Sequence, residues 1–309
     1  MIRRKKKALV LFSGGLDSIL AVKILQKQKI NVVGIAFSSY FFNTRQAKKS
    51  AQEVNIPLKI IYLGSKYLKI VRQPKFGYGS GINPCLDCRI LMLREAKRIL
   101  EKEKFNFIAT GEVLGQRPMT QNKQAIKIIE EETGLVGYIL RPLSAKLFPP
   151  TISEKEKIVA RETLFDIRGR SRKKQIELAK EFNITDYPSP AGGCILTEKD
   201  FAQKLKHILS KKDIIKSRDI KLLRLGRHFW TNNDQTEIIL GRNHQENLRL
   251  KQLVKSDEKF IEPKFSGPSA LIRGIINQTA IDFTWKKIKE RSKNHKGSRQ
   301  LTADGRKQI

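Results

Sequence analysis

The sequence has few cysteines, few aromatic residues and no long hydrophobic run. Three cysteines in 309 residues are a small, odd number, which argues against a secreted disulfide framework. The apolar run at residues 8–12 is too short for a signal peptide, and no stretch approaches the ~18 apolar residues of a membrane span. With aromatics at only 7%, the core must depend on Ile, Leu and Val. These absences predict a cytoplasmic protein, with no membrane partner, whose cysteines are reduced, reactive or metal-bound.

Acidic residues are also scarce. The chain has 62 Lys and Arg against 30 Asp and Glu, a formal net charge of +32. The excess is +18 over residues 1–200 and +14 over residues 201–309, so it is not confined to a basic tail. A Lys-rich thermophile surface normally raises both signs of charge together, whereas here only one is raised. On charge alone, nucleic acid is therefore the leading expected partner, with an anionic membrane surface second.

Hydrophobic residues make up 39% of the chain, enough to bury a core and to exclude a wholly disordered protein. In the first part, strand-like and helix-like segments alternate. The strand-like segments are residues 8–12, 31–37, 58–63, 105–110 and 139–140, and the helix-like ones are 18–28, 44–54 and 92–103. Such alternation predicts an α/β fold with a parallel sheet and helices on both faces. Ligands then bind in the loops that follow the strands.

The second part has a different pattern. Residues 153–182 look helical in two pieces, beginning with a capping box at 153–156. A Pro- and Gly-rich stretch at 187–193 precedes a helix at about 198–209. Beyond 217, we expect strands at 222–225, 228–231 and 237–240 and a helix at 243–254. The predicted organisation is a first domain at 1–197, a linker helix at 198–216, a small α+β domain at 217–285 and a basic flexible tail at 286–309.

The first expected strand and helix are joined by Ser-Gly-Gly-Leu-Asp-Ser, residues 13–18. The glycines allow a tight turn that brings backbone N–H groups to an anion, and the helix N-terminus adds its dipole. Ser13 and Ser18 can donate hydrogen bonds, and Asp17 could hold a Mg²⁺ that bridges phosphates. Without Gly-Lys-Ser/Thr this is not a Walker A loop. Taken alone, it is either a phosphate loop or a glycine turn that caps a helix.

Cys85 and Cys88 form a Cys-x-x-Cys pair, and Cys194 follows two glycines much later in the chain. Such a pair occurs in redox dithiols, zinc sites and iron–sulfur sites. Zinc is disfavoured because a structural site needs four ligands and the four histidines lie elsewhere. Three thiolates fit either a 4Fe–4S cluster with one open iron or a persulfide scheme in which one cysteine carries sulfur and another releases it. Buried structural cysteines are the remaining interpretation.

Residues 13–18 resemble the PP-loop of the pyrophosphate-releasing ATPases, which holds the pyrophosphate end of ATP while an acceptor oxygen is adenylated. With Asn83-Pro84 before Cys85, and with Cys194, the sequence resembles the tRNA thiouridylases, including the 2-thiouridylases. Residues 110–116 (Thr-Gly-Glu-Val-Leu-Gly-Gln) and 141–143 (Arg-Pro-Leu) are closer to the 4-thiouridine synthetases, in which the former loop lies beside the nucleotide. The resemblance covers roughly residues 8–197.

The resemblance implies a tRNA sulfurtransferase with an adenine-nucleotide alpha-hydrolase-like fold. It would use ATP and Mg²⁺ to adenylate a uridine carbonyl oxygen and then transfer sulfur, giving 4-thiouridine in preference to 2-thiouridine. The nucleotide-binding residues would be Ser13, Gly14, Gly15, Asp17, Ser18, Phe37, Gly111 and Gln116. The catalytic residues would be Asp17, Cys85, Cys88 and Cys194, and the same three cysteines would be the metal ligands of a 4Fe–4S cluster. The implied partners are tRNA, free sulfide or a sulfur-carrier protein, and a second copy of the chain in a homodimer.

Further basic residues are candidates for RNA contacts. Arg141 and Lys146 could hold phosphate or RNA backbone. Leu-Gly-Arg-His-Phe at 225–229 and Leu-Gly-Arg-Asn at 240–243 resemble the small RNA-binding module of ribosome-quality-control proteins. That resemblance implies that Arg227, Arg242 and Arg249 contact phosphate and that His228 or Phe229 lies near a base or ribose. The alternatives are a PP-loop amidotransferase or small-molecule ligase, and a non-catalytic RNA-binding protein.

Overall fold

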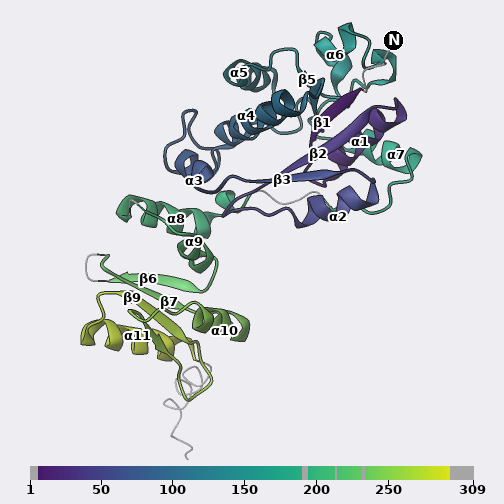
Figure 1. The fold of residues 1–309 in the computed structure, drawn as a ribbon. Coiled ribbons are helices and arrows are strands. Elements are labelled where there is room, and N and C mark those ends of the chain that lie inside the picture. Colours follow the sequence, from purple (N-terminus) through teal and green to yellow (C-terminus); the bar gives the residue numbers. More distant parts are fainter. Residues whose placement is uncertain (1–5, 190–193, 213, 232–233, 293–309) are drawn as a thin grey trace, which may run out of the picture. The chain divides into compact units, whose positions relative to one another are not determined.

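The computed structural model describes residues 6–189, 194–212, 214–231 and 234–292 (Figure 1). The chain divides into two compact units, residues 1–202 and 203–309, and each has its own sheet. None of the helices in the described ranges is long and apolar enough to cross a membrane.

The first unit contains a five-stranded parallel sheet of order β3-β2-β1-β4-β5. Its strands are β1 (Lys7–Leu11), β2 (Asn31–Ser38), β3 (Leu58–Tyr62), β4 (Phe107–Thr110) and β5 (Ile139–Leu140). Its helices are α1 (Leu16–Lys27), α2 (Arg45–Glu53), α3 (Gly64–Arg72), α4 (Cys85–Glu103), α5 (Lys123–Thr133), α6 (Ile152–Lys155) and α7 (Lys173–Glu181). In Figure 1, α1, α2 and α7 lie on one face of the sheet and α3, α4 and α5 on the other. The predicted fold class is therefore confirmed.

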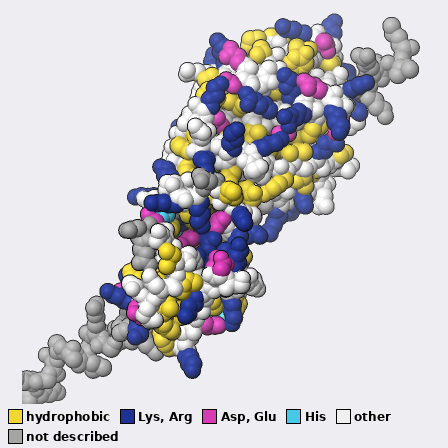
Figure 2. Space-filling view, turned by 60° about the vertical axis from the view of Figure 1, so that its left-hand side comes forward, with side chains coloured by type: hydrophobic (Ala, Val, Ile, Leu, Met, Phe, Trp, Pro, Cys, Tyr) yellow, Lys and Arg dark blue, Asp and Glu magenta, His cyan; other side chains and the backbone are white. Residues whose placement is uncertain are grey.

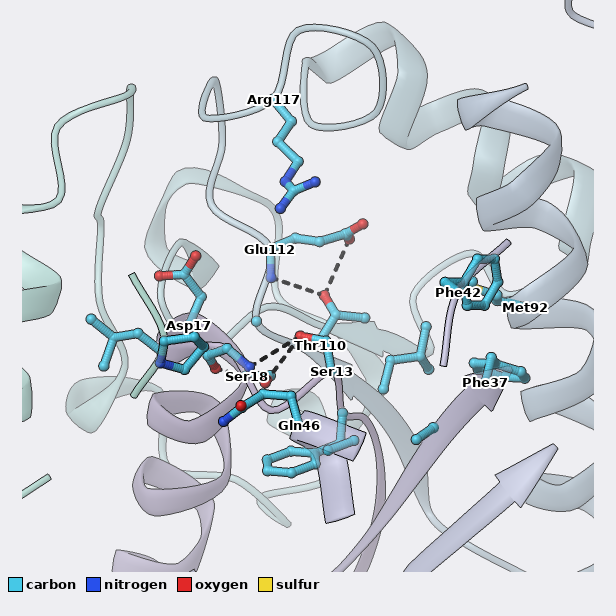
Figure 3. Close-up of a pocket in the computed structure, with 18 of the residues that line it drawn as sticks. Ser13, Asp17, Ser18, Phe37, Phe42, Gln46, Met92, Thr110, Glu112 and Arg117 are labelled. Atoms are coloured by element: carbon cyan, nitrogen blue, oxygen red, sulfur yellow. Dashed lines mark hydrogen bonds between the residues drawn. The ribbon is translucent and has the colours of Figure 1, made fainter. Parts of the chain in front are cut away.

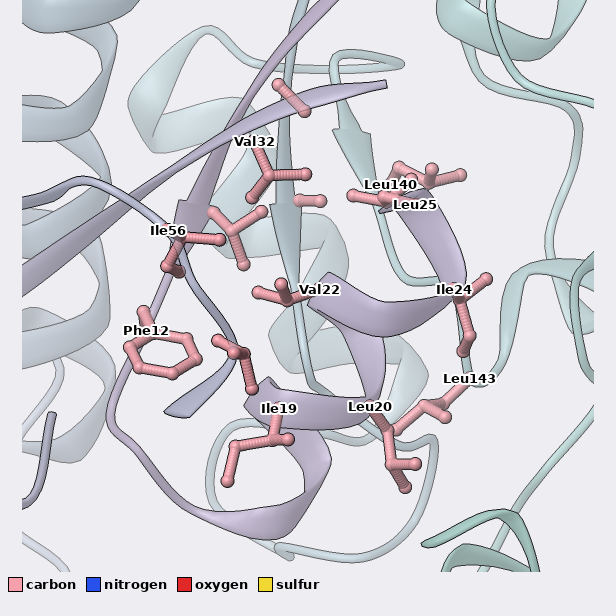
Figure 4. Packing of buried hydrophobic residues seen from close by; sticks show 14 of the residues in the cluster. Phe12, Ile19, Leu20, Val22, Ile24, Leu25, Val32, Ile56, Leu140 and Leu143 are labelled. Atoms are coloured by element: carbon pink, nitrogen blue, oxygen red, sulfur yellow. The ribbon is translucent and has the colours of Figure 1, made fainter. Parts of the chain in front are cut away.

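Helix α1 is apolar on nearly all sides because it packs between the sheet and α7. Ile19, Leu20 and Val22 are fully buried, and they pack with Val32 of β2 and Leu140 of β5 (Figure 4). A helix buried all round reads as continuously hydrophobic. This core fixes the N-terminus of α1 against the end of β1.

Strand register brings the ends of three strands together. Leu11, the last residue of β1, lies opposite Ile35 of β2 and Thr110 of β4. The chain adds β2 and β3 on one side of β1, and then β4 and β5 on the other, so the strand order reverses between β1 and β4. Ligands of open α/β sheets bind at the carboxyl ends of strands at such a point.

The segment at 153–182 is less helical than predicted. It contains only the one-turn α6, a 3₁₀ turn at Arg161–Thr163 and α7. The capping box lies two residues earlier than expected, because Thr151 rather than Ser153 is the N-cap. The Thr151 backbone N–H donates to Glu154 Oε2 at 2.8 Å.

Helix α8 (Lys199–Lys211) spans the division between the units, and the second unit has an antiparallel sheet of order β6-β7-β9-β8. Its elements are α9 (Ser217–Leu223), β6 (Arg227–Thr231), β7 (Thr236–Leu240), α10 (His244–Gln252), β8 (Lys259–Ile261), β9 (Ala270–Gly274) and α11 (Gln278–Arg291). Apolar side chains cover both sheet faces, one against α11 and the other against α9 and α10.

Two predictions for this unit are wrong. Leu222 and Leu223 end helix α9 instead of starting a strand, because the Asp219 carboxylate caps the helix by accepting from the Lys216 backbone N–H at 2.9 Å. The expected loose tail does not begin at residue 286, since α11 continues to Arg291 and buries Ile288 completely. Residues 293–309 lie outside the described ranges.

Candidate active site

The segment between β1 and α1 folds as a tight loop over the N-terminus of α1 (Figure 3). Gly14 has a φ of +78°, and a Cβ there would lie 2.7 Å from the backbone carbonyl carbon of Gln46, so only glycine fits. Ser18 Oγ donates to the Gly15 carbonyl oxygen at 2.8 Å and lies 3.4 Å from Ser13 Oγ. The loop thus gathers two hydroxyl groups at the first turn of a helix, which is the arrangement of an anion site.

A cavity of about 580 Å³ opens at the carboxyl ends of β1, β2 and β4. Its side chains are apolar at one end and polar at the other (Figure 3). The apolar end contains Phe37, Phe42 and Met92, and the polar end contains Ser13, Asp17, Ser18 and Gln46. This volume and this division suit a nucleotide, with its base at the apolar end and its phosphates over the loop.

The predicted nucleotide-binding residues converge on this cavity. Those that line it are Ser13, Gly15, Asp17, Ser18, Phe37, Gly111 and Gln116. Gly14 does not line it, because Gly14 packs against α2 and supports the loop. The structure therefore brings together residues from three separate segments of the sequence.

Asp17 lies in the first turn of α1 and is set up to hold a polar ligand. Gln116 Nε2 donates to Asp17 Oδ2 at 2.9 Å. Burial raises the pKa of Asp17, although Gln116 and the charges of Arg172 and Arg117 oppose the rise. Four buried atoms of cavity-lining residues have no hydrogen-bond partner in the described part of the chain: Asp17 Oδ1, Glu112 Oε1, Gln121 Oε1 and Arg172 Nε. Buried polar atoms are normally paired, so these fit phosphate and a hard cation such as Mg²⁺, which prefers oxygen ligands.

The loop after β4 packs directly against the first turn of α1. A Cβ on Gly111 would lie 2.4 Å from the backbone carbonyl carbon of Asp17 and 2.5 Å from the backbone nitrogen of Ser18. Because all of these neighbours are backbone atoms, they cannot move aside separately. Thr110 Oγ1 donates to Glu112 Oε2 at 3.1 Å and holds the start of this loop. The close approach at Gly111 therefore sets the width of the cavity.

Arg141 does not reach a ligand, so its predicted role in holding phosphate or RNA is wrong. Its side chain is only 4% exposed, and it pairs with Glu112 at 3.1 Å and with Glu130 at 2.5 Å. Lys146 donates to the backbone oxygen of Glu162 at 2.9 Å and does not line the cavity. Arg141 of the Arg-Pro-Leu segment thus stabilises the loop after β4 through its ion pair with Glu112.

Cys85 and Cys88 lie in the first turn of α4, which begins seven residues before the expected start at 92. The helix expected at 92–103 is therefore longer than predicted and includes both cysteines. Asn83 Nδ2 donates to Cys85 Sγ at 3.0 Å, and the Tyr67 hydroxyl of α3 hydrogen-bonds to the Cys88 thiol. A helix start fixes the separation of the two thiols more firmly than a loop does.

Cys88 is protonated at neutral pH. Burial raises the pKa of the Cys88 thiol to about 12, and the nearby Cys194 and Cys85 add to the rise. The Tyr67 hydroxyl and the Arg89 charge favour the thiolate, as expected for a neighbouring basic residue, but burial outweighs them. An unmodified Cys88 is therefore a weak nucleophile, because the thiolate is the reactive form.

Cys194 lies beside the other two cysteines. It precedes a 3₁₀ turn, Ile195–Thr197, and residues 190–193 before it lie outside the described ranges. The Ile82 backbone N–H donates to the Leu196 backbone oxygen at 3.0 Å. A Cβ on Gly81 would lie 2.4 Å from the same oxygen. The turn after Cys194 is thus held against the turn before α4, and charge on Cys194 raises the pKa of Cys88.

The elements that carry the thiols also form part of the cavity wall. None of the three cysteines lines the cavity, but Arg89 and Met92 of α4 do. Pro188 and Ser189, in the segment that leads to Cys194, line it as well. Within the described ranges, no three His, Cys, Asp or Glu side chains are arranged to hold a metal ion. The side chains of the three cysteines, as placed, do not form such a metal-ion site.

His228 in the second unit is buried and makes only internal contacts. Its side chain is fully covered, and its Nδ1 lies 2.9 Å from Glu237 Oε1. Its Nε2 lies 3.2 Å and 3.0 Å from the backbone oxygens of Leu222 and Leu225. The predicted contact of His228 with a base or ribose is therefore wrong.

The other predicted RNA contacts of this unit differ in exposure. Arg242 is exposed but pairs with Glu246, with Nη2 2.6 Å from Oε1. Phe229 is half-buried and packs against α11, and Arg227 is half-buried in the same strand. Arg249 projects from α10 as an exposed side chain. Arg249 is thus an exposed candidate for a phosphate contact, whereas Arg242 is engaged by Glu246.

Several site residues have no signal in the sequence. Tyr67 belongs to α3, Arg89 follows the second cysteine, and Phe42 lies in the turn after β2. Arg117 and Arg172 bring positive charge to the polar end of the cavity. Arg89 and Arg117 are close in sequence to the cysteines and to the Gly111–Gln116 loop. The sequence nevertheless contains so many basic residues that this proximity does not single them out.

Comparison with known proteins gives two family matches and several relatives. Residues 4–163 match the family model of the thiamine biosynthesis protein ThiI, and residues 226–301 match the NFACT protein RNA-binding domain. A tRNA-specific 2-thiouridylase from Karelsulcia muelleri is 26% identical over 68% of this chain and 56% of that protein. A probable tRNA sulfurtransferase from Finegoldia magna is 34% identical over 45% of this chain and 36% of that protein. The chain therefore spans about half the length, or less, of these two relatives.

A solved 4-thiouridine synthetase–RNA complex with bound ATP is 19% identical, with a TM-score of 0.37, over 58% of this chain and 52% of that one. The family matches confirm both resemblances predicted from the sequence. The ThiI model matches more than half of the chain, over the residues that build the sheet, the PP-loop and the Cys-x-x-Cys helix. The chain belongs to the ThiI family.

Proposed function

We propose that this protein is a tRNA sulfurtransferase, which adenylates a uridine carbonyl oxygen with ATP and then replaces that oxygen with sulfur. The family and the names of its relatives support this activity. The single observation that carries the proposal is the shared wall of the two sites. Helix α4 presents Cys88 and also lines the nucleotide cavity through Arg89 and Met92.

In the first step, the uridine carbonyl oxygen attacks the α-phosphorus of ATP and the uridine N3 loses its proton. The bond to the β-phosphate breaks, and pyrophosphate leaves over the loop that contains Ser13 and Ser18. Asp17 would hold the Mg²⁺, which offsets the negative charge of the phosphates when bound. Adenylation converts the uridine oxygen into part of a good leaving group, AMP.

In the second step, a persulfide donor such as a sulfur-carrier protein passes its outer sulfur to Cys88 or Cys194 and is left as a thiol. The resulting cysteine persulfide attacks the activated carbon. A carbon–sulfur bond forms, the carbon–oxygen bond breaks, and AMP leaves with the uridine oxygen. The thiol of the other cysteine then attacks the first cysteine sulfur, releasing thiouridine and leaving a disulfide. An external dithiol must reduce that disulfide before the next turnover. The high pKa of Cys88 favours this scheme, because the attacking group is then the bound sulfur and not the Cys88 thiolate.

We favour 4-thiouridine over 2-thiouridine as the product, because the ThiI model spans the PP-loop and the Gly111–Gln116 loop. A 4Fe–4S cluster on Cys85, Cys88 and Cys194 is the competing way to hold sulfur. No step is assigned to a cluster, because in the described ranges no three such side chains are arranged to hold a metal ion. An iron count and absorbance spectrum after anaerobic purification distinguish the two schemes.

The second unit is proposed to bind tRNA. The matched RNA-binding family and the net positive charge of residues 201–309 support this role. Figure 2 shows that Lys and Arg side chains outnumber acidic ones on the face in view. Arg249 is the proposed phosphate contact because it is exposed on α10. Several such contacts make affinity fall steeply with salt.

The proposal is tested by incubating the full chain with ATP, a persulfide donor, a dithiol and unmodified tRNA. AMP and thiouridine are expected in equal amounts, and nucleoside mass spectrometry identifies the ring position. Cys88→Ala should retain ATP binding and lose thiouridine, whereas Ser13→Ala should lose adenylation. AMP formation that requires a small acid or amine, and not tRNA, would instead support a ligase.

A further inference from the structure

We propose that Arg89 is an anion-binding residue of the nucleotide cavity, and that it holds the phosphate between the base and the pyrophosphate. The inference rests on the proposed adenylation, and it assigns a role to a residue that no motif marks. Arg89 lies on α4, directly after Cys88 and one turn before Met92, and its side chain lines the cavity.

The Arg89 guanidinium is anchored without using up its hydrogen-bond donors. Its Nε lies 3.1 Å from Glu112 Oε1, and the side chain is 23% exposed. The two groups form an ion pair but are not aligned as a hydrogen bond, since Glu112 Oε1 has no hydrogen-bond partner in the described ranges. The N–H groups of Arg89 thus stay available to a ligand, and an arginine fork matches two oxygens of a phosphate.

Glu112 gives Arg89 a fixed anchor. Its other carboxylate oxygen, Oε2, accepts from Thr110 Oγ1 at 3.1 Å and from Arg141 Nε at 3.1 Å. Although burial opposes it, Arg89 and Arg141 together lower the pKa of Glu112, so the carboxylate is charged at neutral pH. Glu130, Arg141, Glu112 and Arg89 then form a chain of alternating charge that ends with a cation at the cavity.

The position of Arg89 identifies which phosphate it meets. The PP-loop serves the far end of the triphosphate, and Met92 on the same helix face contributes to the apolar end. Arg89 pairs with Glu112, which lies between these two ends in Figure 3, where the phosphate attached to the nucleoside must pass. That phosphate is the one that stays with the adenylated uridine, and Cys88 is the preceding residue on α4. Arg89 would therefore neutralise the charge of the AMP leaving group next to the cysteine that takes part in sulfur transfer.

Calorimetric titration of the full chain with AMP and with adenosine tests this role. Charge-assisted hydrogen bonds to phosphate predict that Arg89→Gln weakens AMP binding by about 10- to 100-fold. Adenosine, which lacks the phosphate, should bind the variant as it binds the native protein. Arg89→Lys should recover part of the AMP affinity, because it keeps the charge but not the fork.

Arg94→Gln is the matched control. Arg94 lies on the same helix and pairs with Glu132, and it does not line the cavity. This variant should bind AMP and adenosine normally. Equal losses of AMP and adenosine binding in Arg89→Gln, or no loss of either, would overturn the inference. If native protein makes thiouridine while Arg89→Gln binds AMP normally, the inference alone fails. If Arg89→Gln loses AMP selectively but native protein makes no thiouridine, the proposed function alone fails.

Discussion

Replacing Gly81 by alanine tests whether sulfur transfer needs Cys194 beside α4. An added Cβ would lie 2.4 Å from the Leu196 backbone oxygen and 3.1 Å from the Thr197 Cα. Ordinary contact begins at about 3.4 Å, so the two segments must separate by about 1 Å. The hydrogen bond from Ile82 to Leu196 would lengthen or break, at a cost of about 1 kcal/mol. The first unit should remain folded after a loss of this size, but the shift moves Cys194 away from its position beside Cys88.

The assay separates adenylation from sulfur transfer. A misplacement of about 1 Å in a reacting group can cost about 10²-fold in rate, so Gly81→Ala should form thiouridine about 100-fold more slowly. Exchange of labelled pyrophosphate into ATP should be unchanged, because Gly81 does not line the nucleotide cavity.

Ser80→Ala is the control for this experiment, since Ser80 is exposed in the same turn and already has a Cβ. It should leave both rates unchanged. A Gly81→Ala variant that thiolates tRNA at the native rate would refute the reasoning, because the turn after Cys194 would then have no part in the reaction.

Three other predictions follow from single contacts. Gly111→Ala should abolish ATP binding, because the added Cβ would lie 2.4 Å from the Asp17 backbone. Equilibrium dialysis measures the affinity, and an unchanged value would contradict the close contact between Gly111 and α1. Asp17→Asn should raise the free energy of unfolding at pH 7, because burial raises the pKa of Asp17 and its charged form therefore destabilises the folded protein. The gain should vanish below pH 3.8, the usual Asp value, because the Asp17 carboxyl is then protonated in both the folded and the unfolded protein. Denaturant unfolding of both proteins at the two pH values checks this. Arg249→Gln should reduce the slope of log affinity for tRNA against log salt by about 0.7–0.9, and an unchanged slope would exclude Arg249 as a phosphate contact.

The parallel sheet was predictable because most of its strands are buried on both faces and read as short apolar runs. Residues 8–12 and 31–37 correspond to β1 and β2. The start of α4 was missed, because its first turn contains two cysteines and a charged residue with a tertiary role. Asp87 accepts from the backbone N–H groups of Lys75 and Phe76 at 2.9 Å and 3.1 Å. Such a contact has no periodic signal in the sequence.

The end of the chain was misjudged for a related reason. Helix α11 buries Ala280, Thr284 and Ile288, which are spaced by four residues but are mostly small or polar. Its many basic side chains suggested a loose tail, although this narrow stripe packs on the second sheet. At the end of helix α9, residues 222–225 were predicted to be a strand. A short apolar run occurs both in strands and at buried helix ends, so the sequence alone does not tell them apart.

The candidate site was predictable only where local motifs carry it. The PP-loop, the Gly111–Gln116 loop and the cysteines each have a recognisable pattern. Tyr67 and Arg172 come from other elements and enter the site through packing alone, so sequence gives no reason to select them. The high pKa of Cys88 likewise depends on burial, which the sequence does not encode locally.

The central claim is that tRNA is adenylated before sulfur reaches it. It is tested most directly with Cys88→Ala, ATP labelled at the α-phosphate, and unmodified tRNA. The account predicts that labelled tRNA accumulates in this variant, whereas the native protein with a persulfide donor converts the label to free AMP. A Cys88→Ala protein that binds ATP and tRNA but never labels the tRNA would contradict the account.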